Sequence, residues 1–383
     1  MAANSSENRQ AIAKPTVDNR DAETDAPGNG GPPATNGHKA QNDGRNIDLS
    51  LAGLMGEGAQ QKRTSAQSHP DQPDQRVWQQ LPTADQRDTE RQTYYDRSVV
   101  KEPVWIWTVP LYFFVGGAAG AAAVLGSVAQ WFGDAKLQGL VTRCRWLAAI
   151  GANLGAMLLI ADLGRPRRFL NMLRVFRPTS PMSVGSWVLA GSGASMTVSA
   201  LLNRRRGLLA WVGKLSSAIN VFLGIGLAGY TGVLLTNSVV PLWTAARRSL
   251  PVLFITSGVA SAAALIDFTQ LNGREAKVVR YFGLVGRATE LLAATVVERE
   301  VSQIERVGRP LRAGRSGQLW RASKMLGVVG LLLALWPGNG RTKRRISAIC
   351  TAVSSLLLRY ALMAAGKASA RDPQASFEQQ THL

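Results

Sequence analysis

From residue 104 to residue 365 the chain is a succession of apolar stretches separated by short basic connections. A helix that crosses the hydrocarbon core of a bilayer needs about 20 mostly apolar residues, each adding about 1.5 Å. Several of these stretches reach that length. The pattern therefore predicts an all-α integral membrane protein, built as a bundle of about eight transmembrane helices.

The expected spans lie near residues 104–129, 140–163, 184–202, 208–235, 250–268, 278–297, 319–336 and 346–365. The last three contain charged side chains, which are costly in lipid unless they face the bundle interior or each other. Arg287 and Glu290 in the sixth span are three residues apart, so they share a helix face and can form a pair. An even count of eight is favoured, with six or seven as alternatives.

Residues 1–100 contain almost no apolar run and are rich in Asn, Gln, Asp, Pro, Gly and Ser. Such a sequence cannot bury enough apolar surface to offset the entropy lost on ordering. We therefore expect three parts: a disordered polar tail over 1–100, a transmembrane bundle over 101–368 and a C-terminal tail over 369–383. The N-terminal tail is either a passive extension or a segment that docks a partner.

The formal charge of +19 does not indicate nucleic-acid binding, because most Lys and Arg residues lie in short connections between apolar stretches. Basic residues in such positions contact lipid headgroups and help to fix orientation. The connections on the side of the termini hold somewhat more of them than the opposite ones. We expect a multi-pass protein of the cell membrane with both termini in the cytoplasm.

Metal ligands are scarce in this sequence. Its three histidines, at positions 38, 69 and 382, all lie outside the expected spans, and its two cysteines, Cys144 and Cys350, are far apart. A membrane-embedded b-type haem normally takes axial histidines, and zinc or iron–sulfur sites need clustered cysteines. We expect that this chain binds no metal and no cofactor of its own.

Small residues are concentrated in two expected spans, at 116–120 and 191–195. Runs of Gly, Ala and Ser let helix backbones approach closely within a membrane. Close helix packing is the favoured interpretation, ahead of a role in contacting a ligand.

The connection between the second and third spans is the most distinctive segment, with five arginines between positions 165 and 177. Gly164 and Pro166 should end the second helix, and Ser180 or Ser183 can cap the next one. An ordinary connection needs neither this many prolines nor this many fixed charges. We interpret the segment as a docking platform at the membrane surface.

Several motifs here resemble those of the NrfD/PsrC family of polysulfide-reductase-type membrane subunits. The resemblance covers residues 100–300 well and the last two spans loosely. It is carried by Trp107, Pro110 and Tyr112 to Gly117, by Gly164-Arg165-Pro166, by Arg177 to Ser183 with Gly185-Ser186-Trp187, by Gly229 to Leu235, by Pro241 and Trp243, and by Pro251 to Phe254.

The resemblance implies a subunit that anchors an iron–sulfur protein, itself usually bound to a molybdopterin enzyme, and that binds quinone or menaquinone near that interface. Family members hold no cofactor themselves. Electrons would pass between quinol and a cluster in the partner, while this chain supplies the pocket and the proton path.

On this resemblance, the candidates for quinone binding or proton relay are Asp162, Arg165 and Tyr230. Each has a structural alternative: Asp162 and Arg165 can cap a helix and pair with each other, and Tyr230 can simply pack. Some family members have a polar residue such as His or Asn at the start of the first span, where this chain has residues 101–105, which makes partner anchoring the firmer expectation. The candidates for the partner-docking loop are Arg167, Arg168, Arg177 and Ser180.

Two other classes remain open. A multi-pass transporter without a redox role often contains helices broken near the middle of the membrane, and Asn220 with the glycines near Gly224 could mark such a bend. A purely structural anchor without a quinone site is the third possibility. Asp267, Arg287 and Glu290 could form a second polar path, although an internal ion pair is favoured.

Overall fold

The computed structural model describes residues 47–48, 53–54, 100–162, 171–203, 205–337 and 340–381. The chain divides into two compact units, Met1–Arg87 and Asp88–Leu383. In the first, strand β1 (Ile47–Asp48) pairs antiparallel with β2 (Gly53–Leu54), with Ile47 opposite Leu54. The rest of the segment predicted to be a disordered tail lies outside the described residues.

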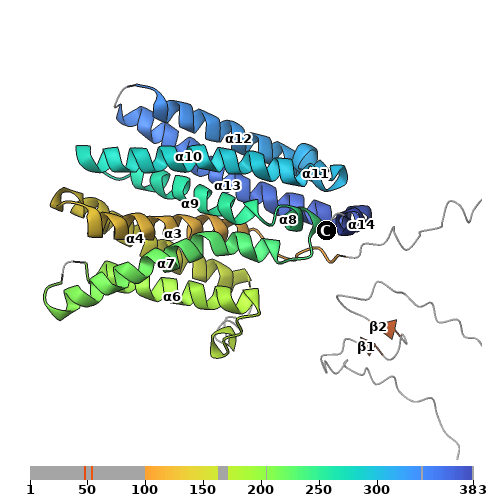
Figure 1. Ribbon diagram of the computed structural model, residues 1–383, viewed down its shortest axis with the longest axis horizontal. Helices are drawn as coiled ribbons and strands as arrows, with labels where there is room; N and C mark the ends of the chain where they lie inside the picture. The colour runs from red at the N-terminus through yellow and green to blue at the C-terminus, as the bar shows by residue number, and fades with distance from the viewer. Residues whose placement is uncertain are drawn as a thin grey trace, which may run out of the picture. The chain divides into compact units, whose positions relative to one another are not determined.

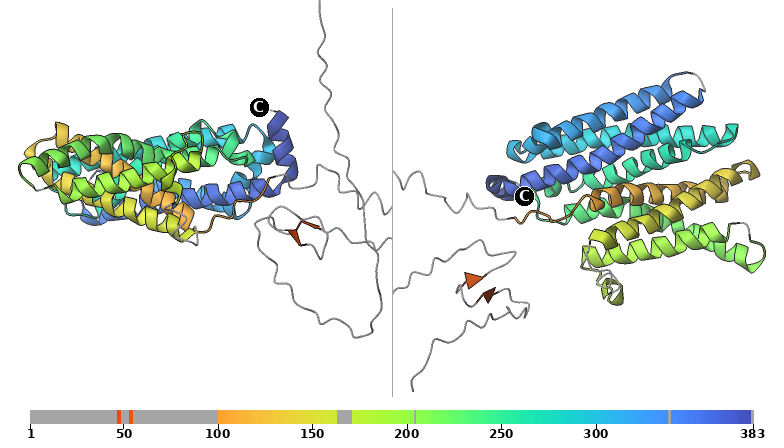
Figure 2. Two further views of the ribbon diagram at one scale, coloured as in Figure 1. Left: turned by 90° about the horizontal axis from the view of Figure 1, so that it is seen from below. Right: turned by 180° about the vertical axis from the view of Figure 1, so that it is seen from behind.

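The second unit is a helix bundle (Figures 1 and 2). The described part contains eight long helices, which lie side by side along one direction. They are α3 (Thr108–Phe132), α4 (Gln138–Asp162), α6 (Pro181–Leu201), α7 (Leu208–Thr236), α9 (Ser249–Asp267), α10 (Gly273–Val301), α12 (Gly314–Leu335) and α13 (Arg341–Arg371). Four short helices join or end them: η2 (Ala135–Leu137), α8 (Pro241–Ala245), α11 (Glu305–Arg312) and α14 (Pro373–Thr381).

Helix α3 is the centre of the bundle, because it packs against α4, α7, α9 and α13. Its close contacts depend on small residues, as predicted for 116–120. A Cβ on Gly224 of α7 would come within 2.6 Å of the Gly120 carbonyl oxygen, and one on Gly258 of α9 within 2.7 Å of the Gly117 carbonyl oxygen. Backbones at these crossings touch directly, so no larger residue fits.

The second small-residue run behaves differently. Cβ atoms added at Gly191 and Gly193 of α6 would meet their nearest atoms only at 3.8–3.9 Å, an ordinary contact distance. The serines of this run make the interhelical contacts instead: Ser195 Oγ lies 3.0 Å from Ser216 Oγ, and Ser192 Oγ donates to the Leu223 carbonyl at 3.4 Å. Helices α6 and α7 are thus joined by hydroxyl groups.

Six helical segments of the described chain are long and apolar enough to cross a membrane: α3, Ala135–Asp162, α7, α9, α12 and α13. Helices α6 and α10, of 21 and 29 residues, are not among these six. Helix α7 runs without interruption through Asn220 and Gly224, so the bend that these residues could have marked is not seen. Asn220 instead donates to Ser199 Oγ at 3.0 Å and ties α7 to α6.

The start of the first long helix and the end of the last one differ from the bounds that the apolar pattern predicts. The first helix begins at Thr108 rather than at residue 104, and α13 continues to Arg371, six residues beyond the expected end at residue 365. The expected C-terminal tail over 369–383 contains the end of α13 and all of α14. Ala375 and Ser376 of α14 are buried, which explains why this polar segment is ordered as a helix.

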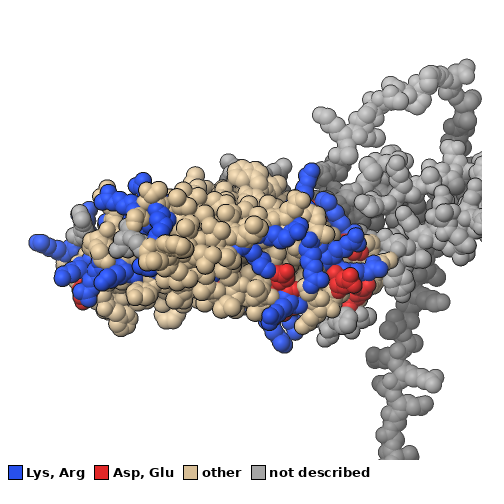
Figure 3. Space-filling model, turned by 90° about the horizontal axis from the view of Figure 1, so that it is seen from above, with Lys and Arg blue, Asp and Glu red and all other residues tan. Residues whose placement is uncertain are grey.

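Charge and exposure divide the bundle surface into zones. Figure 3 shows Lys and Arg side chains gathered toward the two ends on one face, with a largely uncharged surface between them. Large apolar side chains are also exposed on the bundle surface, among them Phe222, Tyr281, Leu292 and Met325, each at least 65% exposed. A surface of this kind suits contact with lipid hydrocarbon, because exposed apolar patches of this extent are rare in water.

Candidate functional site

The predicted site residues come from one end of the bundle, where α4 ends and α6 begins. This is the same end at which α7 and α10 end and α8, α11 and α14 lie (Figure 1). Arg165, Arg167 and Arg168 belong to the segment 163–170 and lie outside the described residues. The structure describes the other four predicted residues, Asp162, Arg177, Ser180 and Tyr230. Their contacts define the geometry of this end of the bundle.

Asp162 closes the start of the first helix. Its Oδ1 accepts a hydrogen bond from the Ile106 backbone N–H and another from Thr108 Oγ1, both at 3.3 Å. The first N–H groups of a helix have no partner within the helix, and a carboxylate there also favours the positive end of the helix dipole. Asp162 therefore joins the end of α4 to the start of α3, through Ile106 before the helix and through the Thr108 side chain rather than through the helix N–H groups.

The return into α6 is fixed by two serines. Ser180 is the N-cap, and its Oγ accepts from the Ser183 backbone N–H at 3.4 Å, with Pro181 at the first helical position. Ser183 Oγ accepts from the Arg177 N–H at 3.0 Å and donates to the Val175 carbonyl at 3.2 Å. The predicted capping role of Ser180 is confirmed, and the turn holds the exposed Arg177 at the bundle end.

Tyr230 of α7 lies against Gly185 of α6. A Cβ on Gly185 would collide with the Tyr230 ring, which explains why a glycine precedes Ser186 and Trp187. The Tyr230 hydroxyl is buried, and no acceptor for its proton lies within hydrogen-bond distance in the described part of the chain. A buried O–H without an acceptor is unusual and costs free energy, so it marks a place where a ligand oxygen would be favourable.

A second tyrosine belongs to the same region. Tyr112 of α3 is 3% exposed and packs its ring on Gly155 of α4, and Gly116 of α3 borders both the Tyr112 ring and Leu227, one turn before Tyr230 in α7. Gly155 and Asp162 are seven residues apart on one face of α4, and Tyr112 lies one turn from Thr108 on α3. The phenols of Tyr112 and Tyr230 and the carboxylate of Asp162 thus form a line that runs from inside the bundle to its end. We call this line of three residues the seam.

Apolar side chains are exposed at the same end of the bundle, just before and within the first turns of α6. Phe176 and Trp187 meet edge to face with ring centroids 6.1 Å apart, and they are 56% and 43% exposed. Met182, in the first turn of α6, is 57% exposed. An aromatic ring that arrived from the lipid would find an apolar surface here, beside the turn that carries Arg177.

A second polar cluster lies inside the other half of the bundle, between α9, α10 and α13. Glu290 Oε1 accepts from Ser257 Oγ at 2.5 Å and from Ser355 Oγ at 2.8 Å. Arg359 donates to Ser257 Oγ and, at 2.9 Å, to the Ser355 carbonyl, and its guanidinium lies over the Phe254 ring. Ser257 therefore links the buried Glu290 carboxylate to the buried Arg359.

This arrangement corrects one sequence prediction. Arg287 and Glu290 do not pair with each other: Arg287 NH2 lies 3.9 Å from Asp267 Oδ2, and Glu290 is held by the cluster around Arg359. Three-residue spacing places both side chains on one face of α10, but that face packs against both α9 and α13. Arg287 meets Asp267 of α9, whereas Glu290 lies between α9 and α13. The favoured ion pair within the bundle is present, formed between Arg287 and Asp267.

Arg359 is the residue that sequence reasoning undervalued. It is 1% exposed and lies in α13, within an otherwise apolar stretch. The lone charge in the eighth expected span was the available signal. Its partners could not be read from spacing, because they come from helices about 70 and 100 positions earlier.

The described residues contain no group of three or more His, Cys, Asp or Glu side chains placed to hold a metal ion. Cys144 is buried and Cys350 half-buried, and both are free thiols. At the end where α4 ends and α6 begins, the described phenol, carboxylate and hydroxyl groups can form hydrogen bonds and transfer protons.

Comparison with known proteins agrees with these motifs. Residues 97–370 match the family model described as polysulphide reductase, NrfD. The C chain of polysulfide reductase from Wolinella succinogenes is 25% identical over 177 residues, which is 41% of this chain and 55% of that protein. Protein NrfD from Escherichia coli K12 is 26% identical over 305 residues, 69% of this chain and 95% of that protein.

The first of these matches spans little more than half the length of its relative, whereas the family model covers most of this chain. The bundle of apolar helices and the matched motifs at its end agree with that assignment. The chain is a multi-pass membrane protein of the NrfD polysulphide reductase family.

Proposed function

We propose that this chain is the membrane-anchor subunit of an oxidoreductase complex, in which it passes electrons between the quinone pool and an iron–sulfur partner. The family and its two relatives, one named as a chain of polysulfide reductase, support a place in a membrane redox complex. The iron–sulfur clusters, and a molybdopterin centre beyond them, would belong to partner subunits.

The Tyr230 hydroxyl is the single observation that carries the quinone site. Its proton has no acceptor among the described residues, and a quinone carbonyl is an acceptor of suitable size and polarity. The exposed apolar surface of Phe176, Met182 and Trp187 offers a route for a ring from the lipid. We place the quinone head at the end of the seam formed by Tyr112, Tyr230 and Asp162.

Quinone reduction takes up two electrons and two protons, and quinol oxidation releases them. The electrons would come from or go to a cluster in the partner. At this end of the bundle, Tyr230 would donate a hydrogen bond to the quinone oxygen, and Asp162, half-buried beside Thr108, would exchange the proton with the surface. Arg165, near Asp162 in sequence, is proposed as a second ligand of the quinone head.

The test uses the intact complex in proteoliposomes and measures quinol-dependent reduction of the partner's clusters. Tyr230→Phe keeps the ring against Gly185 and removes only the O–H, so we expect at least a tenfold slower rate. Tyr281→Phe, at a 70% exposed tyrosine of α10, is the matched control and should retain the wild-type rate. If Tyr230→Phe combined with Arg165→Ala leaves the rate unchanged, the proposed site is wrong.

The docking of the iron–sulfur subunit is proposed for the same end of the bundle. Arg177 is exposed there, held by the capped turn at Ser180, and the predicted docking residues Arg167 and Arg168 lie on the same connection. Helix α11 extends this surface with Arg306, Arg309 and Arg312, and the exposed Arg247 and Arg248 follow α8 at the same end. Co-purification with the full chain would identify the partner, since a docked subunit should elute together with this chain.

We also propose that all eight long helices cross the cell membrane, with both termini on the cytoplasmic side. Helix α6 has no charged residue, and its exposed side chains, such as Trp187, Val198 and Leu201, are apolar. Helix α10 buries Arg287 and Glu290 and exposes Tyr281, Val285 and Leu292 toward the surroundings. Both helices therefore expose apolar side chains to the lipid, and neither exposes a charged side chain in the middle of the span, as a membrane-spanning helix requires.

A further inference from the structure

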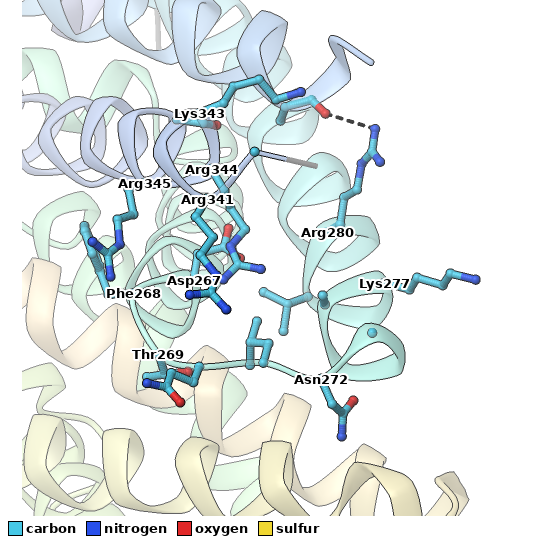
Figure 4. Close-up of a pocket in the computed structure, with 18 of the residues that line it drawn as sticks. Asp267, Phe268, Thr269, Asn272, Lys277, Arg280, Arg341, Lys343, Arg344 and Arg345 are labelled. Carbon is cyan, nitrogen blue, oxygen red and sulfur yellow. Dashed lines mark hydrogen bonds and ion pairs between the residues drawn. The ribbon is translucent and has the colours of Figure 1, made fainter. Parts of the chain in front are cut away.

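A basic cavity lies at the end of the bundle opposite the proposed quinone site (Figures 1 and 4). It has a volume of about 760 Å³ and is formed by the end of α9, the turn at 268–272, the start of α10, the end of α12 and the start of α13. Figure 4 shows Arg341 and Arg344 of α13 pointing into it beside Asp267. Nothing in the proposed electron transfer uses this cavity.

Positive charge dominates its lining. Eight Lys and Arg side chains line the cavity and only one carboxylate, that of Asp267. Asp267 is already shared, since it lies 3.9 Å from Arg287 and 3.8 Å from Arg344. So many cations around one space repel one another, and an anion within the cavity would relieve that repulsion.

Several of these cations have no carboxylate partner in the described ranges: Lys277, Arg280, Arg341 and Arg345. Arg280 donates to the Ala334 carbonyl at 3.2 Å, a contact that joins α10 to α12 at the cavity wall. These four cations are therefore not neutralised by the ion pairs that Asp267 makes with Arg287 and Arg344. They form an array of donors with unused capacity.

A buried guanidinium supplies an independent observation. Arg287 lines the cavity and is only 4% exposed, yet its Nε and one terminal NH₂ group have no hydrogen-bond partner in the described part of the chain. Leaving buried charged donors unsatisfied is costly. Phosphate oxygens accept two parallel N–H bonds from arginine, so a phosphate at this depth would satisfy both groups.

The surroundings favour a phosphate that is attached to lipid. The cavity lies where transmembrane helices end, at the level of the headgroups. The helix faces beside it are apolar and exposed: Leu332, Leu335 and Trp336 at the end of α12 are 58%, 55% and 68% exposed, and Tyr281 of α10 is 70% exposed. Acyl chains would lie along these side chains, whereas a free phosphate ion would make no use of them.

We propose that this cavity binds the phosphate of an anionic phospholipid, with the acyl chains along the exposed faces of α10 and α12. Arg287 would hold the phosphate at the inner end, and Arg341 and Arg345 would contact it from the start of α13. The bound lipid would join α10 to α12 and α13, which meet at this end through few direct bonds.

The test titrates the full chain in detergent with phosphatidylglycerol, cardiolipin, phosphatidylcholine or inorganic phosphate. Native mass spectrometry counts bound lipid, and thermal unfolding reports stabilisation. The variant Arg341→Gln/Arg345→Gln removes two exposed cavity charges. The matched control, Arg205→Gln/Arg206→Gln, removes two exposed charges from the α6–α7 connection, at the same end but outside the cavity.

We expect saturable binding of the anionic lipids but not of phosphatidylcholine. Each basic residue near an anionic headgroup contributes about fivefold in affinity, so the double variant should bind about 30-fold more weakly while the control binds as the wild type does. Arg345→Gln alone, with about a fivefold loss, serves if the double variant fails to fold. Equal loss in cavity and control variants, or stabilisation by inorganic phosphate with no added effect of lipid, would overturn the proposal.

Discussion

At the scale of single residues, the charges buried between α9, α10 and α13 are the most sensitive part of the molecule. Glu290→Ala removes the carboxylate that Ser257 links to Arg359 and leaves that arginine buried without compensation. Breaking a buried charge pair in this way costs about 3–5 kcal/mol. We expect a correspondingly large drop in the free energy of unfolding, measured by denaturant titration in mixed micelles.

The matched control is Glu298→Ala in the same helix. Glu298 accepts from Lys324 at 2.5 Å, but both side chains are about 30% exposed at the bundle end. Exposed pairs contribute about 0–1 kcal/mol, so this variant should unfold nearly as the wild type does. Similar losses in both variants would show that burial does not control the stability of the cluster.

At the scale of elements, the crossing of α3 and α7 depends on the absence of side chains. A Cβ on Gly224 would stand 2.6 Å from the Gly120 carbonyl oxygen, too close for any contact between these atoms. We expect Gly224→Ala to separate the helices and to lower the free energy of unfolding by about 1–3 kcal/mol, as overpacking does. Thermal unfolding in detergent would measure this loss.

Gly191→Ala in α6 is the comparison, because its added Cβ meets only the Leu223 side chain, at 3.9 Å. Alanine is also the better helix former. This variant should be neutral or slightly more stable. An equal loss at both positions would mean that backbone contact is not what distinguishes the two small-residue runs.

Length and apolar composition were enough to locate the long helices, because each expected span overlaps one of them. Composition could not give the short helices α8 and α11, which are ordered by tertiary contacts of residues such as Trp243 and Leu311. The Ser180 cap was predictable from its local sequence. The place of Tyr230 against Gly185, and the partners of Arg287, depend on how helices face each other, which spacing along one helix does not determine.

At the scale of the whole molecule, the last long helix holds the segment that precedes the first. Arg371 pairs with Glu102 at 2.8 Å, Lys367 donates to the Trp105 carbonyl at 2.7 Å, and Trp105 stacks on Trp243. The Arg371 guanidinium lowers the pKa of Glu102 below its ordinary value of 4.5. The link therefore contributes stability above that ordinary value and loses it as the pH falls through the lowered pKa.

We expect Glu102→Gln to raise hydrogen exchange of residues 100–107 at neutral pH, after correction for intrinsic rates. The difference from the wild type should vanish as the pH falls through the lowered pKa of Glu102, because the protonated carboxyl is then as neutral as the glutamine. Glu305→Gln, at an exposed carboxylate of α11 without an ion-pair partner in the described chain, should change nothing. A difference that persists at low pH would contradict this explanation.

The number of membrane crossings decides which ends of the molecule share a compartment, and α10 is the critical helix because it holds more charged residues than any other long helix. Its charged residues divide into three groups: Arg274, Glu275, Lys277 and Arg280 at one end, Arg287 and Glu290 buried inside, and Glu298 to Glu300 at the other end. Between the two ends, Val285 and Leu292 are 61% and 65% exposed, as lipid-facing residues should be. About 25 Å of helix separates the two charged ends, close to the thickness of the hydrocarbon core.

Single cysteines introduced into a Cys144→Ala/Cys350→Ala background would test this crossing. A membrane-impermeant maleimide should label Arg274→Cys from one side of sealed vesicles and Arg299→Cys only from the other. Val285→Cys and Leu292→Cys should resist the reagent from both sides, because water does not reach the lipid-facing surface. If both ends were labelled from the same side, α10 would not cross the membrane, and the number of membrane-spanning helices would be smaller than eight. The basic cavity and the docking end would then no longer lie on opposite faces of the membrane.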